Sequence, residues 1–385
     1  LEKSLDARLS AGEDITLSID AGVQAVVARE IARQMEVFEA IGGAGVVLDI
    51  HSGEVVAMVS LPDYNPNHFA AIEDDARFNR ATLGLYEMGS TFKVLNTAIA
   101  LESGATTTSS YYEVSKPLRF GRFSVWDYHM YDRDLSVPEI LVLSSNIGSA
   151  RMAADIGAER QQFYLRQLGL FDKASLEIPE MANPLVPGTW RSTSIATVSY
   201  GHGISVTPLH LASSVAAASG SGTMVEPTLL HRGGAPAPMG ERLFSEETTK
   251  AVRSMMRLVV SHPDGTGNFA EAKGYMVGGK TGTSEKINPD GGYFKDKNIA
   301  SFAATFPVHD PRYVLVVMVD EPKGQKHSYG YATGGWVAAP AAKRIIEHAA
   351  PLLGILPVDE NSPSIRQKLM LDFKIGNEEA ALASY

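Results

Sequence analysis

A serine and a lysine three residues apart are the first candidates for covalent chemistry in this sequence. Ser90 and Lys93, in Ser90-Thr-Phe-Lys93, begin a predicted helix, where positions i and i+3 share one face. A serine hydroxyl is a weak nucleophile near neutral pH unless a neighbouring base, such as a neutral lysine, takes its proton. Because an ordinary lysine has a pKa of about 10.4, burial or a second cation must lower that pKa. The pair therefore suggests an acyl-transfer nucleophile, although the same spacing also arises by chance.

Two further motifs are weak signals when each is taken alone. Ser144-Ser-Asn146 lies between two predicted helices, where its hydroxyl and amide could face a cleft or could cap the second helix. Lys280-Thr-Gly-Thr283 follows a glycine-rich predicted strand, and glycines there let a substrate backbone approach closely. In the order S-x-x-K, S-x-N and K-T-G, however, the three motifs are the signature of serine enzymes that react with β-lactams.

On these motifs the chain resembles the transpeptidase domain of class B penicillin-binding proteins, and within them the septal cell-division type. Met88 is a departure, because the family usually has proline before Gly-Ser. The resemblance implies a peptidoglycan D,D-transpeptidase of the serine-type D-Ala-D-Ala carboxypeptidase class. Such an enzyme cross-links stem peptides at D-Ala-D-Ala through an acyl-enzyme, is inhibited covalently by β-lactams, and uses no cofactor or metal. Further matches are Asn79-Arg-Ala81, Ser199-Tyr-Gly-His-Gly-Ile-Ser-Val-Thr-Pro208, Gly265-Thr-Gly267, Asp310-Pro-Arg-Tyr313 and Asp320-Glu-Pro322.

The resemblance also implies a catalytic role for five side chains. Ser90 would be the acylated nucleophile and Lys93 its general base. Ser144 would relay a proton to the leaving amine, and Asn146 would hydrogen-bond the amide of the stem peptide or the drug side chain. Lys280 would add positive potential that helps to keep Lys93 neutral, and it would orient Ser144.

Substrate binding is expected on the K-T-G strand. The positions expected to bind the stem peptide or a β-lactam are Thr281, Gly282 and Thr283, of which the two threonines would hold the terminal carboxylate. The backbone N–H groups of Ser90 and Thr283 would form the oxyanion hole.

The elements that must position these residues follow from periodicity, with strands predicted near both ends of the chain and helices in the middle. We therefore expect an α/β (α+β) fold with a large helical lobe inserted at about residues 88–270. The resemblance makes this the penicillin-binding/β-lactamase-like transpeptidase fold, a five-stranded antiparallel sheet flanked by helices. The predicted strands are 14–20, 44–50, 55–61, 275–283, 299–306 and 313–319, and the predicted helices are 21–40, 89–103, 137–144, 147–156, 158–168, 208–218, 246–260 and 338–353.

Length and charge constrain the partners and the compartment. The chain has 385 residues, a formal net charge of −10 and no cysteine, which argues against nucleic acid as a partner and excludes disulfides. No apolar run approaches the roughly 18–20 residues that cross a bilayer. We expect a linker remnant at residues 1–13, the transpeptidase domain at 14–355 and a solvated tail at 356–385. By resemblance, this is the periplasmic domain of a bacterial inner-membrane protein with an anchor upstream, working with cell-division membrane proteins that include a glycosyltransferase.

Three alternatives compete with this interpretation. The stretch from Gly274 to Thr281 fits the phosphate-loop pattern of nucleotide hydrolases, but a helix-like segment precedes it and a turn follows it. A serine β-lactamase or a β-lactam sensor shares the three motifs, but Glu180-Met-Ala-Asn183 has the wrong spacing for the glutamate motif that activates the deacylating water. An inactive scaffold is disfavoured because every reacting side chain is present. The histidines show no metal-binding spacing, and His202 is expected to be structural.

Overall fold

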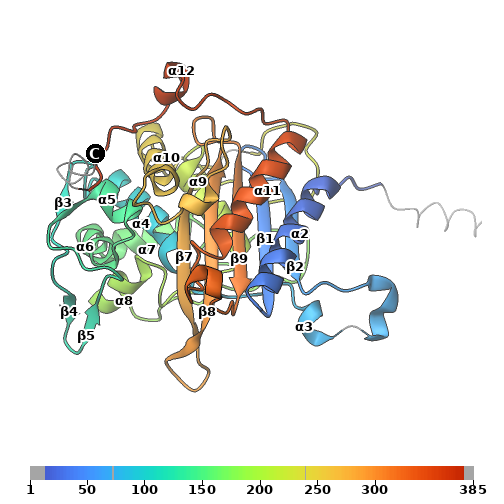
Figure 1. Ribbon diagram of the computed structural model, residues 1–385, viewed down its shortest axis with the longest axis horizontal. Helices are drawn as coiled ribbons and strands as arrows, with labels where there is room; N and C mark the ends of the chain where they lie inside the picture. The colour runs from blue at the N-terminus through green and yellow to red at the C-terminus, as the bar shows by residue number, and fades with distance from the viewer. Residues whose placement is uncertain (1–13, 72, 239, 377–385) are drawn as a thin grey trace, which may run out of the picture.

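A central antiparallel sheet is the frame of the molecule in the computed structural model, which describes residues 14–71, 73–238 and 240–376 (Figure 1). The strand order is β2-β1-β9-β8-β7, so strands from both ends of the chain lie side by side and the predicted five-stranded sheet is confirmed. β2 and β7 are the two edges. The strands are β1 (Gly42–Asp49), β2 (Val55–Leu61), β7 (Gly278–Ile287), β8 (Tyr293–Phe306) and β9 (Tyr313–Asp320).

Helices cover both faces of this sheet, which explains why β1 and β9 are buried along their whole lengths. Helices α2 (Ala21–Val37) and α11 (Ala338–Leu352) pack together over one face. Helix α9 (Pro208–Ser219) packs against β1 and β9 from the other side, and α10 (Glu246–Ser261) packs against β7. No helix in the described part of the chain is long and apolar enough to span a membrane.

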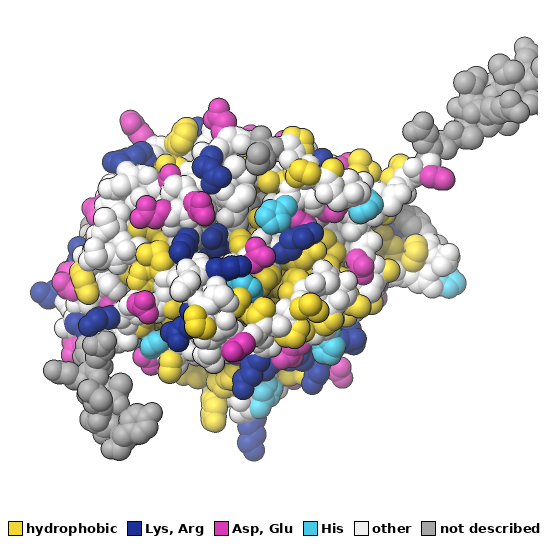
Figure 2. Space-filling model, turned by 90° about the horizontal axis from the view of Figure 1, so that it is seen from above, with side chains coloured by type: hydrophobic (Ala, Val, Ile, Leu, Met, Phe, Trp, Pro, Cys, Tyr) yellow, Lys and Arg dark blue, Asp and Glu magenta, His cyan; other side chains and the backbone are white. Residues whose placement is uncertain are grey.

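The predicted solvated tail after α11 lies against the rest of the molecule over residues 357–376, with about half of its side chains exposed. The segment crosses the upper surface of the molecule, through the short helix α12 (Pro363–Arg366), toward the helical lobe (Figure 1). It buries Leu369, which is 6% exposed. On the face seen from above, Lys and Arg side chains lie among Asp and Glu side chains (Figure 2). The linker remnant predicted at residues 1–13 lies outside the described residues, as do residues 377–385.

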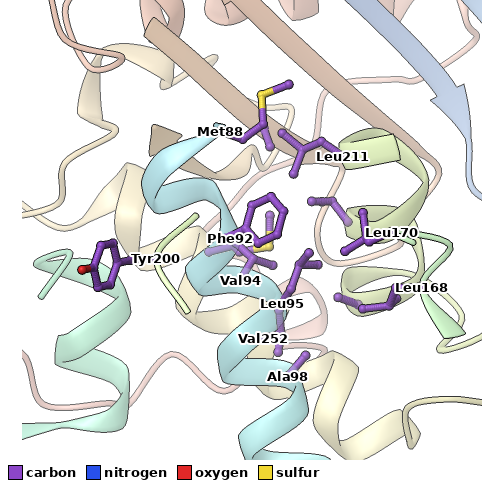
Figure 3. Close-up of a cluster of buried hydrophobic side chains, with 14 of the residues drawn as sticks. Met88, Phe92, Val94, Leu95, Ala98, Leu168, Leu170, Tyr200, Leu211 and Val252 are labelled. Carbon is purple, nitrogen blue, oxygen red and sulfur yellow. The ribbon is translucent and has the colours of Figure 1, made fainter. Parts of the chain in front are cut away.

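The helical lobe is inserted between β2 and β7, as predicted, and its core surrounds α4 (Phe92–Glu102). Figure 3 shows Phe92 and Leu95 of this helix among Leu211 of α9 and Val252 of α10. Nine residues of α4 are buried, so the helix is held on nearly every side. The other helices of the lobe are α5 (Val137–Val142), α6 (Asn146–Ile156), α7 (Ala158–Gln167) and α8 (Ser192–Val198).

The differences from the predicted elements are local. No strand forms at 14–20, where Leu17 makes only an isolated bridge to Leu230 and the Asp20 side chain caps α2. β7 and β8 extend beyond their predicted ends into a long hairpin, and α8 was not predicted. The remaining short elements are α3 (Asp74–Arg77), β3 (Tyr111–Tyr112), β4 (Leu118–Phe120), β5 (Phe123–Val125), β6 (Leu135–Ser136) and the 3-10 turns η1 (Pro66–Ala71), η2 (Gly89–Thr91), η3 (Asn268–Ala270) and η4 (Lys326–Ser328).

Candidate active site

The predicted nucleophile lies where the chain turns into α4. Ser90 is in η2, one residue after Gly89, whose φ of +57° is the left-handed conformation that favours glycine. Gly201 packs directly behind this turn, and a Cβ atom at Gly201 would lie 2.2 Å from the Gly89 carbonyl oxygen. Two glycines in contact therefore let the turn sit deep in the lobe while Ser90 stays partly exposed.

Lys93 is fully buried and brings the first two motifs together. Its Nζ lies 2.8 Å from Ser90 Oγ, as expected for positions i and i+3 of a helix. The same nitrogen is 2.7 Å from Asn146 Oδ1 and 2.7 Å from the Ser144 carbonyl oxygen. The Ser144 hydroxyl is a fourth oxygen near this nitrogen, so the lysine has little freedom and its position relative to Ser90 is fixed before any substrate arrives.

Ser144 connects the two lysines. Its Oγ lies 3.1 Å from Lys93 Nζ and 2.9 Å from Lys280 Nζ, so one hydroxyl joins the helical lobe to the sheet. Ser144 has a φ of +64°, uncommon for a residue other than glycine, and both its carbonyl and its hydroxyl oxygen lie near Lys93. The predicted S-x-N motif is thus both a helix start and a part of the site, since Ser145 caps α6.

Lys280 lies within β7 and is also fully buried. Besides Ser144, its Nζ lies 3.2 Å from the Thr281 carbonyl oxygen and 3.4 Å from Thr266 Oγ1. Thr266 was not singled out from the sequence as a site residue, although it belongs to the matching stretch Gly265-Thr-Gly267.

Burial sets the charge state of the two lysines. It lowers the pKa of Lys93 to about 7, and the negative charge of Asp127 opposes this shift. Burial also lowers the pKa of Lys280 well below its usual value, and the charge of Lys93 lowers it further. Neither lysine forms an ion pair with a carboxylate among the described residues. Near neutral pH Lys93 therefore exists in part as the neutral amine, the form that a general base requires.

Asp127 is a site residue that the sequence analysis missed. Its carboxylate accepts hydrogen bonds from the hydroxyl of Ser145 at 2.6 Å and from the backbone N–H of Ile147 at 2.9 Å. It also accepts one from the backbone N–H of Asn146. These donors are at the N-terminus of α6, where a negative charge is stabilised. The preceding carbonyl, of Trp126, accepts from Asn146 Nδ2 at 3.0 Å. The loop that contains Trp126 and Asp127 thereby holds the S-x-N motif in place. No local sequence pattern indicates this role of Asp127.

The cluster opens into a cleft of about 610 Å³ between the helical lobe and the edge of the sheet at β7. Five of the predicted site residues line this cleft: Ser90, Ser144, Asn146, Thr281 and Thr283. The two lysines are buried beneath these residues and do not line the cleft. Six of the other lining residues carry aromatic rings: Tyr128, His129, Tyr131, Phe269, Tyr331 and Trp336.

The K-T-G residues divide between the cleft and the interior. Thr283 is partly exposed and its Oγ1 accepts a hydrogen bond from the Gly334 N–H at 3.0 Å. Gly282 is buried, and a Cβ atom there would lie 2.3 Å from the Met88 carbonyl oxygen. Gly282 therefore permits close packing against the turn before Ser90, and its contact with a ligand stays a prediction.

The geometry also bears on the alternatives. Lys280 lies inside a strand rather than in a loop that opens a helix, so the phosphate-loop alternative is wrong. Glu180 lines a separate cavity of about 480 Å³ beside β2, away from the cleft that contains Ser90. His202 is partly buried next to Tyr200 and Tyr293, and burial lowers its pKa. Within the described ranges, no three His, Asp or Glu side chains are grouped to hold a metal ion.

Comparisons with known proteins agree with this geometry. Residues 43–347 match the family described as the penicillin binding protein transpeptidase domain. The chain is 40% identical to the probable peptidoglycan D,D-transpeptidase FtsI of Caulobacter vibrioides over 92% of its length, and 33% identical to the peptidoglycan D,D-transpeptidase FtsI of Escherichia coli (strain K12) over 90%. It spans 62% and 58% of these two relatives.

A solved structure is similar over the same region. The transpeptidase domain of penicillin-binding protein 3 from Burkholderia pseudomallei superposes with a TM-score of 0.80 at 30% sequence identity. The match covers 92% of this chain and 100% of that domain. The likeness thus includes the sheet, the helical lobe and the cleft between them.

Proposed function

The chain belongs to the penicillin-binding protein transpeptidase family, and on that premise we propose that it is a peptidoglycan D,D-transpeptidase with Ser90 as nucleophile. The observation that carries the proposal is the continuous set of contacts from Ser90 through Lys93 and Ser144 to Lys280. It places a hydroxyl nucleophile against a buried lysine whose pKa is about 7, at the edge of a cleft large enough for a peptide.

In the first half-reaction, neutral Lys93 accepts the hydroxyl proton while Ser90 Oγ attacks the carbonyl carbon of the penultimate D-Ala. The backbone N–H groups of Ser90 and Thr283 hold the oxyanion. The C–N bond to the terminal D-Ala then breaks, and Ser144 passes the proton that Lys93 accepted to the departing amine. In the second half-reaction the amine of an acceptor stem peptide attacks the ester carbonyl and displaces Ser90. The proton that this amine loses passes through Lys93 to Ser90 Oγ, which completes the cross-link and restores the free enzyme.

Binding roles follow from the position of each residue. Asn146, held by Lys93 and the Trp126 carbonyl, hydrogen-bonds the amide of the donor peptide. Thr281 and Thr283 bind the terminal carboxylate, and the buried cation of the lysine pair adds positive potential beside it. A β-lactam carries a reactive amide and a carboxylate, so it occupies the same groups and acylates Ser90.

We further propose a septal role in cell division, on the periplasmic side of the inner membrane. The sequence stretches Lys280-Thr-Gly-Thr-Ser-Glu-Lys286 and Tyr200-Gly-His-Gly203, together with the similarity to the Caulobacter relative, support this role. Cell-division membrane proteins, including a glycosyltransferase, are the proposed partners.

The test of the enzymatic proposal is the mass of the protein after incubation with penicillin. We expect one adduct, located on Ser90 by peptide mapping and absent in Ser90→Ala. An adduct of full yield in the Ser90→Ala variant would place the nucleophile elsewhere, and no adduct in the unaltered chain would make it an inactive scaffold.

The fate of the adduct separates a transpeptidase from a β-lactamase. Because Glu180 lines a different cavity, it is not placed to activate a water against the ester. We therefore expect the adduct to persist for many minutes. Steady hydrolysis of a chromogenic cephalosporin on a timescale of seconds would favour the β-lactamase alternative.

A further inference from the structure

Residues 357–376, which we call the strap, run from the end of α11 across α10 to α5 (Figure 1). The strap contacts both the helical lobe and the region of the sheet, which together supply the residues of the site. At one end of their course lies the lead-in to β7, which carries Lys280, and at the other lies α5, which ends two residues before Ser144.

The first anchor of the strap is at Glu360. Its carboxylate lies 2.8 Å from Arg257 Nη2 and accepts the backbone N–H of Gly274 at 2.7 Å. Arg257 is 5% exposed, and its Nη1 donates to the Val277 carbonyl at 2.9 Å. Val277 directly precedes β7, so Glu360 is tied through one buried guanidinium to the strand of Lys280.

The middle of the strap is apolar. Leu369 packs with Met276 and Val308 in a small buried cluster next to the sheet. The neighbouring backbone N–H, of Met370, donates to Ser254 Oγ on α10 at 2.8 Å. These contacts join the strap to the helix that lies between β7 and α5.

The far anchor is at Glu139, on α5. Glu139 is 3% exposed, and its Oε1 accepts the backbone N–H of Gly376 at 2.9 Å. Its Oε2 completes the capping box that begins α5, accepting from the Ser136 N–H at 2.8 Å. A helix of six residues has little stability of its own, so its position depends on contacts such as these. Further strap residues packed against the lobe are Met370, Leu371, Phe373 and Ile375.

We propose that the strap is a positioning element that fixes the position of α5 relative to β7. It thereby keeps Ser144 Oγ within hydrogen-bonding distance of Lys280 Nζ. That contact is 2.9 Å long and joins the two parts of the site directly. A hydrogen bond weakens steeply when its atoms separate or its angle bends, so a small shift of α5 is enough to weaken proton transfer. The consequence for catalysis rests on the proposed function.

The test compares three chains that end after Gly376, Gln367 and Leu356. The first is the control, because it keeps the whole strap. The second keeps the Glu360 anchor but loses Leu369 and the contact to Glu139, and the third loses the strap. For each we would measure the noncovalent binding constant and the acylation rate constant with a fluorescent penicillin, together with thermal unfolding.

We expect the control to match the full chain, and the chain ending after Gln367 to acylate about tenfold more slowly, with binding changed less than threefold. The adduct should still form on Ser90, so this loss differs from a failure of the enzymatic proposal, in which the full chain itself would not react. A folded chain ending after Gln367 that acylates like the full chain would overturn the proposal.

A mutant cycle tests the route of the effect. If the strap acts through Ser144 and Lys280, the same truncation in a Lys280→Met background should cost less than threefold. Equal costs in both backgrounds would mean that the strap does not act through this contact.

A point variant in the full chain covers the case in which truncation prevents folding. Glu360→Gln weakens the first anchor, and we expect a two- to fivefold lower acylation rate constant. The matched control is Glu347→Gln, which alters a surface pair with Lys343 on α11 and should change nothing. Identical rate constants for both variants would count against the strap.

Discussion

Two lysines on one strand, Lys280 and Lys286, have opposite environments. Lys280 is fully buried and makes no ion pair with a described carboxylate, and burial lowers its pKa. Lys286 has a partly exposed side chain that lies 2.8 Å from Asp320 and 2.7 Å from Glu321. Burial acts to lower its pKa too, but the two carboxylates outweigh burial and raise it.

The contrast shows which lysine serves stability and which serves chemistry. A buried cation without a counter-charge costs free energy, and a fold keeps such a group where its reactivity is used. A lysine between two carboxylates stays protonated near neutral pH and therefore cannot act as a base. We therefore expect mutations at the two positions to affect different properties.

The largest expected effect is on acylation. Lys280→Met removes the hydrogen bond to Ser144 and the positive potential near the substrate carboxylate, and should slow acylation by penicillin by roughly 10²–10³-fold. Lys286→Met should change the rate constant less than threefold, because neither Lys286 nor its partners Asp320 and Glu321 line the cleft. Stopped-flow kinetics give the acylation rate constants of both variants. Similar decreases in the two rate constants would contradict the assignment of Lys280 to chemistry and Lys286 to stability.

The second effect is on stability and falls on the other lysine. Lys286→Met leaves Asp320, which is 4% exposed, without its nearest cation. Breaking a pair of this kind should lower the free energy of unfolding by about 2–3 kcal/mol, since Lys286 is partly solvated. Urea unfolding measures the loss, and adding Asp320→Asn should recover part of it. An unchanged midpoint in Lys286→Met would show that the pair is not structural.

A smaller effect is expected at the loop that fixes the S-x-N motif. Asp127→Asn replaces an acceptor of three hydrogen bonds with an amide that turns donors toward the start of α6. Acylation should slow about tenfold and stability should fall by about 1–2 kcal/mol. Asp132→Asn, an exposed acid in the same stretch, is the control. Equal kinetics in the two variants would remove Asp127 from the site.

The comparison of Asp127 with Ser144 also shows which site residues can be predicted from the sequence and which cannot. Residue type reveals the three motifs, and periodicity predicts six strands, of which five form the sheet. Ser90, Lys93, Ser144 and Lys280 come together as the resemblance implies. Asp127 caps a helix that begins 19 residues later in the chain, so no local spacing reveals it. The strap was missed for a similar reason, because its apolar residues follow no helical or strand period and Leu369 is buried against Met276 and Val308, which are distant in the sequence.

The smallest effect is the dependence of stability on pH. Lys93 has a pKa near 7 when folded and near 10.4 when unfolded, so between these values the unfolded chain binds more protons. Stability should therefore rise with pH above 7, by roughly 1 kcal/mol from pH 7.5 to 8.5 for this group. Lys93→Met should flatten the rise in urea unfolding, and an equal slope in both proteins would argue against a lowered pKa.

The central claim is that Lys93 is a neutral base near pH 7, and the pH dependence of acylation tests it most directly. The rate constant for penicillin acylation would be measured from about pH 5 to 10 for the unaltered chain and for Lys280→Arg. Because arginine does not titrate in this range, any acidic limb that remains in Lys280→Arg belongs to Lys93 rather than to Lys280. We predict a limb with a midpoint near 7 in both proteins. A midpoint near 10, or a limb that disappears in Lys280→Arg, would contradict the assignment of Lys93 as the base.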